Sequence, residues 1–329
     1  MPQPDPIQAD YNFQVKDCFL GAQMLFVAFG ALVLVPILTG LDSNVALFSA
    51  GVGTLIFQLV TKGKVPVFLA SSFAFLPPLF AAQQGQFTHS GIMCGLVAAG
   101  VLYIILSLLV RFFGSGFLHR LLPPIVTGPV IMLIGLILAP VAVHMAMGRA
   151  GDGSIWLEPK VPAMIIAGVA LATTILVSLL GRNWLKLIPI LCGIAAGYAA
   201  AILLDMIGFT ESMHASFMAT AVDGKIQGVA PAPWMDTALI SFGGLADHPW
   251  LAIPKFTLPT WNFDAILFVL PIAIAPAIEH FGDVLAIGSI TGKDYVEDPG
   301  IQNTMLGDGL ATSFASMIGG PPNTTYSEV

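Results

Sequence analysis

Three chemically active side chains stand close together inside a long hydrophobic run of this sequence. Glu279, His280 and Asp283 lie between Phe263 and Thr291, where most other residues are apolar. A carboxylate at the centre of a membrane helix costs roughly 2.5–3.5 kcal/mol on insertion scales, so such a residue usually faces a cavity, a partner or a substrate. Residues four apart share one face of a helix, which groups Glu279 with Asp283 and directs His280 elsewhere. The spacing predicts a polar substrate site or proton site within a membrane protein, and a structural role for His280.

The composition is that of a membrane protein with several spans. The chain has 329 residues, a mean hydropathy of +0.87 and only 9% charged residues, whereas a soluble domain has about 25%. Its 34 Gly and 24 Pro suit closely packed and broken membrane helices. The net charge of −7 argues against nucleic acid as a partner. The cysteines fit no metal motif, and HExxH and GxSxG are absent, so we expect no metal, no cofactor and no enzymatic activity.

Hydropathy predicts the membrane segments. A transmembrane helix needs about 20 apolar residues, and about eight stretches qualify. These stretches are residues 17–40, 45–61, 91–110, 124–144, 162–180, 187–207, 263–290 and 301–318. Most Lys and Arg residues fall in loops that share one side with the N-terminus, which favours a cytoplasmic tail at residues 1–16. Residues 208–262 are then an extracytoplasmic loop, interpreted as a structural flap rather than a lid.

Two shorter segments, residues 65–82 and 319–329, are interrupted by proline. Pro66 and the pair Pro321 and Pro322 remove backbone donors, so these stretches cannot lie in mid-helix. Ser71 and Ser72 in the first break, and residues 323–325 in the second, are good helix N-caps. Each break is therefore predicted to be a short extended piece followed by a half-helix that begins inside the membrane.

The two breaks stand at matching places in the chain. Two full spans precede each break, but the first unit starts inside the cell and the second, after an odd number of crossings, starts outside. Such an inverted repeat with paired interrupted segments is a sequence pointer to a transporter site. The half-helices would present their N–H groups and positive dipole ends at Phe73 and Ser327, where they would bind carbonyl oxygens or the anionic edge of a small planar solute.

At these residues the chain resembles the nucleobase–ascorbate transporter family, and within it the bacterial uracil–proton symporters. The matching pieces are FGALVLVP at residues 29–36, KGKVPVFLASSFAF at 62–75, EHFGD at 279–283 and PNTTYSE at 322–328. The resemblance implies an all-α polytopic membrane protein with a seven-plus-seven inverted-repeat fold, in which a short β-strand precedes each of two broken helices. Residues 17–207 would be the first repeat and residues 263–329 the start of the second, with the chain truncated in the tenth segment.

The same resemblance implies a set of site residues. A carboxylate at the position of Glu279 would pair with the pyrimidine ring, and a second, at Glu328, would contact its other edge. The pocket would be completed by backbone amides that bind ring oxygens, at Phe73 and Ser327, and by side chains that line it, at Ala31 and Tyr326. Glu279 and Asp283 would couple transport to protons. Asp308, in a later span, stays open between a site role and a structural role.

The expected function is import of uracil in symport with protons, by alternating access around a midplane site. One departure keeps an alternative open. Uracil members usually have histidine where this chain has Asp283, whereas the purine branch commonly has aspartate, so a xanthine or purine-base proton symporter is the runner-up. An anion transporter of the same fold is disfavoured, because two acids in the pocket repel an anion. The expected location is the bacterial inner membrane, with lipid, nucleobase and protons as partners and a homodimer as an open option.

Overall fold

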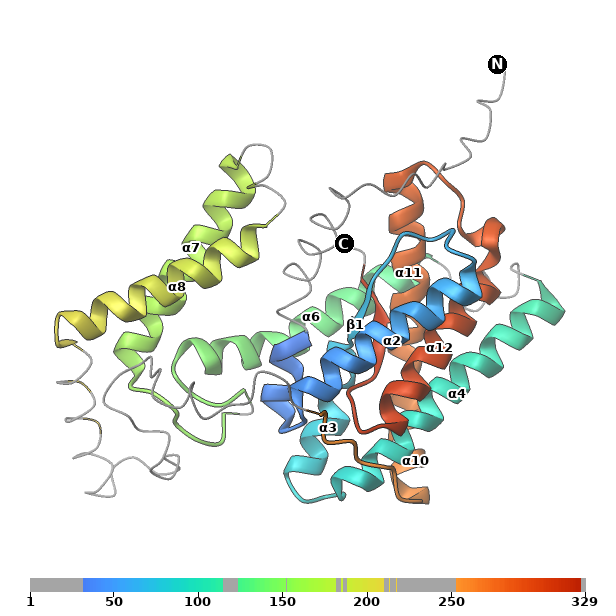
Figure 1. Ribbon diagram of the computed structural model, residues 1–329, viewed down its shortest axis with the longest axis horizontal. Coiled ribbons are helices and arrows are strands. Elements are labelled where there is room, and N and C mark those ends of the chain that lie inside the picture. Colours follow the sequence, from blue (N-terminus) through green and yellow to red (C-terminus); the bar gives the residue numbers. More distant parts are fainter. Residues whose placement is uncertain are drawn as a thin grey trace, which may run out of the picture.

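The computed structural model describes residues 32–114, 124–151, 153–181, 188–209 and 253–326, together with Leu185, Met213 and Phe217. Helices dominate it (Figure 1). They are α2 (Ser43–Thr61), α3 (Leu76–Gln83), α4 (His89–Phe113), α6 (Pro124–Ala146), α7 (Lys160–Leu180), α8 (Pro189–Met206), α10 (Phe263–Ile272), α11 (Ile274–Thr291) and α12 (Ile301–Met317). Shorter elements are the 3₁₀ turn η1 (Phe73–Phe75), the π-helical turn η4 (Val296–Gly300), and the strands β1 (Leu69–Ser71) and β2 (Asn323–Thr325).

The predicted spans coincide with helices wherever the structure describes them. The span predicted at residues 263–290 is divided into α10 and α11 by a bend at Ala273, which lies between Pro271 and Pro276. Of the first predicted span, residues 32–39 are helical and the earlier residues lie outside the described part. Within the described residues, five helices, counting α10 and α11 as one, are long and apolar enough to cross a membrane.

Local sequence sets several of the helix ends. The side chains of Asp42, Thr88 and Asn262 accept hydrogen bonds from amides two or three residues further on, and so cap the first turns of α2, α4 and α10. At the other end, α11 stops at Gly292, whose φ of 70° is in the left-handed region that glycine adopts without strain. These ends are therefore fixed by residues next to them in the chain.

Helix α12 lies at the centre of a bundle, with α2, α4 and α11 packed around it and α10 packed on α4. Glycines allow α4 and α12 to touch backbone to backbone. A Cβ atom added to Gly309 of α12 would lie 2.8 Å from the carbonyl oxygen of Gly100 and 2.9 Å from Cβ of Tyr103, both on α4. Small residues at such crossings are the usual means of close packing between membrane helices.

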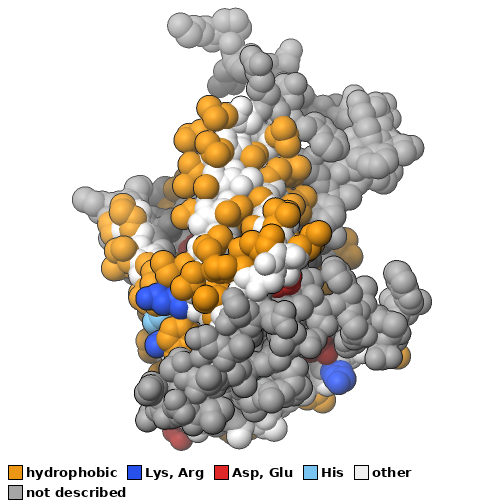
Figure 2. Space-filling model, turned by 90° about the vertical axis from the view of Figure 1, so that its left-hand side faces the viewer, with side chains coloured by type: hydrophobic (Ala, Val, Ile, Leu, Met, Phe, Trp, Pro, Cys, Tyr) orange, Lys and Arg blue, Asp and Glu red, His pale blue; other side chains and the backbone are white. Residues whose placement is uncertain are grey.

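Helices α7 and α8 form a pair that stands apart from this bundle (Figure 1). They pack on each other, and α6 joins them to the bundle because it contacts both α7 and α11. Figure 2, which views the molecule from this side, shows hydrophobic side chains gathered over the described part of the face. The exposed apolar residues of the pair include Leu171, Leu179, Leu180, Leu203 and Met206. An apolar surface of this extent suits contact with lipid rather than water.

Residues 253–262, called the strap here, run across one end of the bundle. The backbone amide of Thr257 donates to the carbonyl oxygen of Ile318 at 3.1 Å, and that of Thr260 donates to the carbonyl oxygen of Ser90 at 3.0 Å. The strap therefore ties the end of α12 to the start of α4. It is part of the loop predicted at residues 208–262, most of which lies outside the described residues.

The close crossing of α4 and α12 makes a stability prediction. Gly309→Ala should lower the melting temperature of the protein in detergent by several degrees, because overpacking a well-packed contact costs about 1–3 kcal/mol. Gly168→Ala in α7 is the matched control, since a Cβ there meets nothing within 4 Å. Equal melting temperatures for the two variants in a thermal unfolding assay would contradict the backbone contact.

Candidate functional site

The two broken segments meet in the middle of the bundle. Strand β1 pairs with β2 in antiparallel fashion, with Leu69 opposite Thr325 and Ser71 opposite Asn323. The pairing continues beyond both strands, because the amide of Ser72 donates to the carbonyl oxygen of Pro322 at 2.8 Å. Backbone groups freed by the breaks thus satisfy one another, as membrane depth requires. The extended piece predicted before each half-helix is confirmed in both segments.

The prediction of helix N-caps in these segments is wrong in its details. Ser72 holds the N-cap position of η1, but its side chain makes no capping hydrogen bond. Ser71 and residues 323–325 belong to the strands. The reason is that pairing across the break keeps these residues extended, so their backbone groups are already satisfied by the other segment. The half-helix expected from Ser327 lies outside the described residues.

Side chains of α2 hold the first break in place. Gln58 Nε2 donates to the carbonyl oxygens of Val65 and Val67, both at 3.0 Å. Thr54 Oγ1 accepts from the amide of Leu69 at 3.0 Å. These contacts supply partners for backbone groups of an irregular segment that no helix or strand satisfies. The sequence analysis did not single out either residue, although a glutamine inside an apolar span was a usable signal.

The second break is held by α2 and α12 together. Asn323 Nδ2 donates to the carbonyl oxygen of Ser49 at 2.9 Å, and Thr312 Oγ1 donates to the carbonyl oxygen of Asn323. Asn323 and Ser49 are completely buried, and so is Thr312. Two hydrogen-bonded side chains, those of Asn323 and Thr312, therefore fix β2 against the helices on either side.

The predicted carboxylates lie on one continuous helix beside β2. α11 runs through both Glu279 and Asp283, which confirms the helix that their spacing required. Asp283 is buried, with 9% of its surface exposed, and its Oδ2 atom accepts a hydrogen bond from Thr325 Oγ1 at 3.2 Å. Glu279, one turn earlier, is half-buried. The carboxylate of Asp283 is thus hydrogen-bonded directly to the second broken segment.

His280 also reaches β2, which corrects the expectation that it points away from the two carboxylates. Its ring is completely buried, with Nδ1 3.1 Å from Thr325 Oγ1 and Nε2 3.1 Å from Thr304 Oγ1 of α12. Thr325 therefore contacts both His280 and Asp283. Helical periodicity alone had separated these two side chains, and the position of β2 brings them to one hydroxyl.

Asp308 of α12 belongs to the same buried cluster. Its Oδ2 atom lies 3.7 Å from His280 Nδ1, and its side chain has no exposed surface. Electrostatic interaction links its carboxyl group to those of Asp283 and Glu279, and links Tyr103 of α4 to Asp308 and Glu279. The sequence analysis left Asp308 open and did not single out Tyr103. Three carboxyl groups, an imidazole and a phenol in one buried cluster can hold and pass protons.

Phe73 and Tyr326 flank the crossing of the two strands. Both pack against a small buried cluster that contains Leu32. Tyr326 Oη donates to the carbonyl oxygen of Ser71 at 2.7 Å, so a side chain from the second break holds the backbone of the first. Phe73 is half-buried at the start of the half-helix formed by η1 and α3.

Three of the predicted pocket residues, Ala31, Ser327 and Glu328, lie outside the described residues. Of the other predicted residues, Phe73 and Tyr326 lie at the strand crossing, and Asp283 is linked to that crossing through Thr325. Glu279 is part of the cluster around Asp308. In the described part of the chain, no group of three or more His, Cys, Asp or Glu side chains is arranged to hold a metal ion.

A cavity of about 440 Å³ adjoins Phe73. Its walls come from α3, α6 and the bend between α10 and α11, and they include Phe80, Leu138 and Pro271. The cavity is mainly apolar and lies between the bundle and α6. It offers space for movement or passage next to the strand crossing, with Phe73 forming part of its wall.

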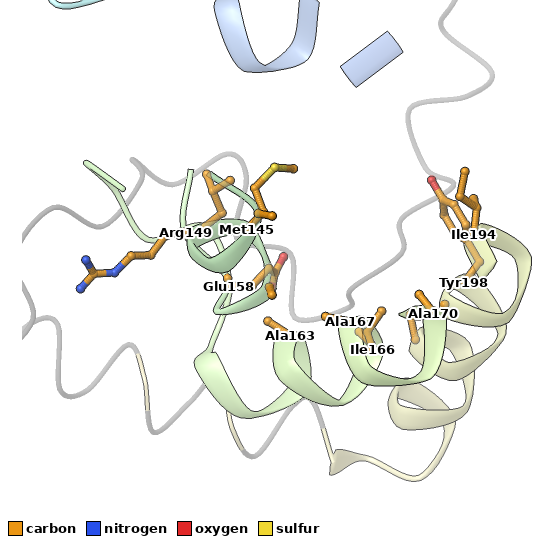
Figure 3. A pocket seen from close by; sticks show the side chains of 15 residues that line it. Met145, Arg149, Glu158, Ala163, Ile166, Ala167, Ala170, Ile194 and Tyr198 are labelled. Carbon is orange, nitrogen blue, oxygen red and sulfur yellow. The ribbon is translucent and has the colours of Figure 1, made fainter. Parts of the chain in front are cut away.

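A larger cavity, of about 560 Å³, lies between α6, α7 and α8. Figure 3 shows Ala163, Ile166 and Ala170 of α7 on one wall and Tyr198 of α8 beside them, while Arg149 points away. The Arg149 guanidinium lies 4.2 Å from the centre of the Trp156 ring. None of the predicted site residues lines this cavity, and its lining is mostly apolar, so it is not the candidate site.

Comparison with known proteins identifies a matching family and several similar proteins. Residues 15–329 match the model of a family described as the permease family. A probable uracil permease of Haemophilus influenzae is 46% identical over 329 residues, which cover 99% of this chain and 70% of that protein. The uracil permease of Escherichia coli K12 is 34% identical over 310 residues, which cover 94% of this chain and 63% of that protein.

Among solved structures, the transmembrane domain of a cyanobacterium bicarbonate transporter, BicA, matches with a TM-score of 0.57. The match covers 94% of this chain and 74% of that domain, at 15% sequence identity. At that identity the likeness shows a shared fold and nothing about the substrate.

The hydrogen bond between Tyr326 and Ser71, which joins the two breaks, leads to a second prediction about stability. Tyr326→Phe should lower the free energy of unfolding by about 1–2 kcal/mol, because it leaves the buried carbonyl oxygen of Ser71 without its hydrogen bond. Tyr198→Phe on α8 is the matched control, since Tyr198 is 57% exposed. The measurement is thermal unfolding in detergent, and an unchanged melting temperature for Tyr326→Phe would contradict the contact.

Proposed function

Because the chain belongs to the permease family, and is thus a multi-pass membrane transporter rather than an enzyme, we propose that it imports a nucleobase, uracil, in symport with protons. Relatives named uracil permease match nearly the whole chain, which supports uracil as the substrate. The observation that carries the proposal is the junction of the two breaks with the carboxylates of α11. Phe73 and Tyr326 lie at that junction, and Thr325 connects it to Asp283.

The chemistry of uracil suits this junction. Uracil is a neutral planar ring with N–H donors and carbonyl acceptors on its edge. In the proposal, the carboxylate of Glu279 accepts from a ring N–H, and Glu328 does the same at the other edge. The amide of Phe73, at the start of the half-helix formed by η1 and α3, and the amide of Ser327 donate to ring carbonyl oxygens in this scheme. Phe73 and Tyr326, with Ala31, form the walls against the ring.

Proton coupling is proposed to use the buried cluster behind the junction. Glu279 and Asp283 exchange protons during the cycle, and Asp308 lies close enough for its charge to influence both. Charges so close together in a medium of low dielectric cannot all be ionised without a large cost, so protonation of one depends on the others. The proton is the coupling ion in this scheme, and no other cofactor takes part.

Alternating access is proposed to arise from the division into two parts. The bundle of α2, α4, α10, α11 and α12 carries the site, whereas α7 and α8 pack mainly on each other. The cavity next to Phe73 lies at the boundary between the bundle and α6. Movement of one part past the other would open this boundary to one side and then to the other. Residues 17–207 and 263–329 are assigned to the two inverted repeats of the family, in the bacterial inner membrane with a cytoplasmic N-terminus.

Replacement of Glu279 tests the proposal directly. Glu279→Gln in the full-length protein should abolish uptake of radiolabelled uracil driven by an inward proton gradient, because an amide cannot exchange the proton. Glu297→Gln, an exposed acid in η4, is the matched control and should transport normally. Proteoliposomes with and without the gradient give the measurement. Gradient-driven uptake that persists in Glu279→Gln would rule out the assigned role.

Xanthine remains a second candidate substrate because of Asp283. The buried position of Asp283 and its hydrogen bond from Thr325 favour a role behind the site rather than contact with a larger base. We therefore expect an excess of unlabelled xanthine to leave uracil uptake nearly unchanged. Uptake that xanthine blocks, or xanthine uptake without uracil uptake, would move the assignment to the purine bases.

Anion transport is the third candidate, because the fold is shared with a bicarbonate transporter. Carboxylates at Glu279, Asp283 and Asp308 would repel an anion in the pocket. Sulfate and bicarbonate should therefore fail to compete with uracil in the same assay.

A further inference from the structure

The ring of His280 is held by two hydroxyl groups, one from each of two elements. Nδ1 lies 3.1 Å from Thr325 Oγ1 of β2, and Nε2 lies 3.1 Å from Thr304 Oγ1 of α12. The ring has no exposed surface, and the Phe57 ring of α2 packs against it with 6.4 Å between the ring centres and an angle of 72° between the ring planes. Each nitrogen of this imidazole thus has a defined partner, and the proposed transport scheme assigns the ring no role.

Each of the two hydroxyl groups also has a second partner, which is an acceptor in one case always and in the other case, that of Asp283, while its carboxyl group is ionised. Thr304 Oγ1 lies 3.1 Å from the carbonyl oxygen of Ile301, and Thr325 Oγ1 lies 3.2 Å from Asp283 Oδ2. A hydroxyl has a single proton to donate. If both protons go to these acceptors, both hydroxyls must accept from the ring, and both ring nitrogens must then carry a proton. A histidine with two N–H groups is the imidazolium cation.

Acidic groups surround the His280 ring and would stabilise a positive charge on it. Asp308 Oδ2 of α12 lies 3.7 Å from Nδ1. Asp283 is reached through Thr325, and Glu279 precedes His280 on α11. From α4, Tyr103 contributes a buried phenol that interacts electrostatically with Asp308 and Glu279. Phe57, Thr304 and Thr325, which also contact the ring, do not titrate.

We propose that His280 carries a proton in this state and that the proton sets the direction of the Thr325 hydroxyl. With Nδ1 protonated, the Thr325 hydroxyl accepts from the ring and donates to ionised Asp283, an arrangement that agrees with the distances of 3.1 Å and 3.2 Å. With Nδ1 deprotonated, the hydroxyl turns to donate to Nδ1, and Asp283 loses that hydrogen bond. The proton on His280 is thereby coupled to the charge on Asp283 through the Thr325 hydroxyl.

In this scheme His280 is a positioning residue that acts through Thr325. Thr325 pairs with Leu69 and directly precedes Tyr326, whose hydroxyl holds the other broken segment, so the switch lies within the strand crossing. The inference deepens the proposed function and rests on it, because the consequence of the switch is a pH dependence of nucleobase binding. At low pH His280 is protonated and Asp283 keeps its donor. As the pH rises and His280 loses its proton, Asp283 loses the hydrogen bond from Thr325.

The first test measures the protonation state of His280 and needs no substrate. The full-length protein with ¹⁵N-labelled histidine should give a solid-state NMR signal of an imidazolium with two protonated nitrogens, and this signal should vanish in His280→Gln. His89→Gln is the matched control, because His89 is exposed at the start of α4. A His280 signal with one unprotonated nitrogen at about pH 6, where an unperturbed histidine is largely charged, would overturn the proposal.

The second test measures the coupling between the proton on His280 and uracil binding. Uracil affinity of the wild type should change by about tenfold between about pH 6 and about pH 8, since a hydrogen bond to a charged group contributes roughly that factor. Thr325→Val, which removes the hydroxyl but keeps the shape, should flatten this dependence, and so should His280→Gln. Thr325→Ser retains a hydroxyl and should behave as the wild type.

The outcomes separate the two proposals. Wild-type protein that binds no uracil would refute the proposed function, while the histidine spectrum would still decide the state of His280. Wild-type protein that binds uracil with the same pH dependence as Thr325→Val would refute the switch and leave the proposed function intact. Uracil binding that Thr325→Val retains at both pH values shows that this variant is folded, and wild-type behaviour of Thr325→Ser shows that the hydroxyl is the group responsible.

Discussion

The structure depends on one constraint, which is that backbone N–H and C=O groups inside a membrane must find partners within the protein. Two proline-containing segments break their helices at that depth and expose such groups. Their solution is to pair with each other as β1 and β2. Because this pairing joins residues 69–71 to residues 323–325, the two segments are fixed together although most of the chain separates them.

The helices around the crossing are specialised to support it. Polar side chains from α2 and α12, among them Gln58 and Thr312, donate hydrogen bonds to backbone carbonyl oxygens that the strand pairing does not satisfy. Glycines such as Gly100 and Gly309 bring α4 and α12 close enough to enclose the polar cluster. The same bundle thus supplies hydrogen-bond partners for the irregular backbone of the breaks and also buries titratable side chains. Both tasks require closely packed helices that carry polar side chains, and a purely apolar core could not perform them.

Function follows from what this arrangement places side by side. A carboxylate helix, α11, meets a strand whose Thr325 contacts both Asp283 and His280, and a further acid, Asp308, faces the imidazole from α12. Proton-accepting groups therefore lie next to the strand crossing, where we propose that the nucleobase binds. Coupling of proton movement to substrate binding needs such adjacency, because the interaction between charges falls with distance and with hydration.

The sequence by itself determined the membrane class, the positions of the helices, the two breaks and the shared helix of Glu279 and Asp283. These features follow from composition, from proline chemistry and from the helical period, which act over a few residues. Only the tertiary structure decided that Ser71 and residues 323–325 pair as strands rather than cap helices, that His280 reaches Thr325, and that Tyr103 and Asp308 join the cluster. Those outcomes depend on how distant helices rotate and approach one another, and no local spacing in the chain encodes that geometry.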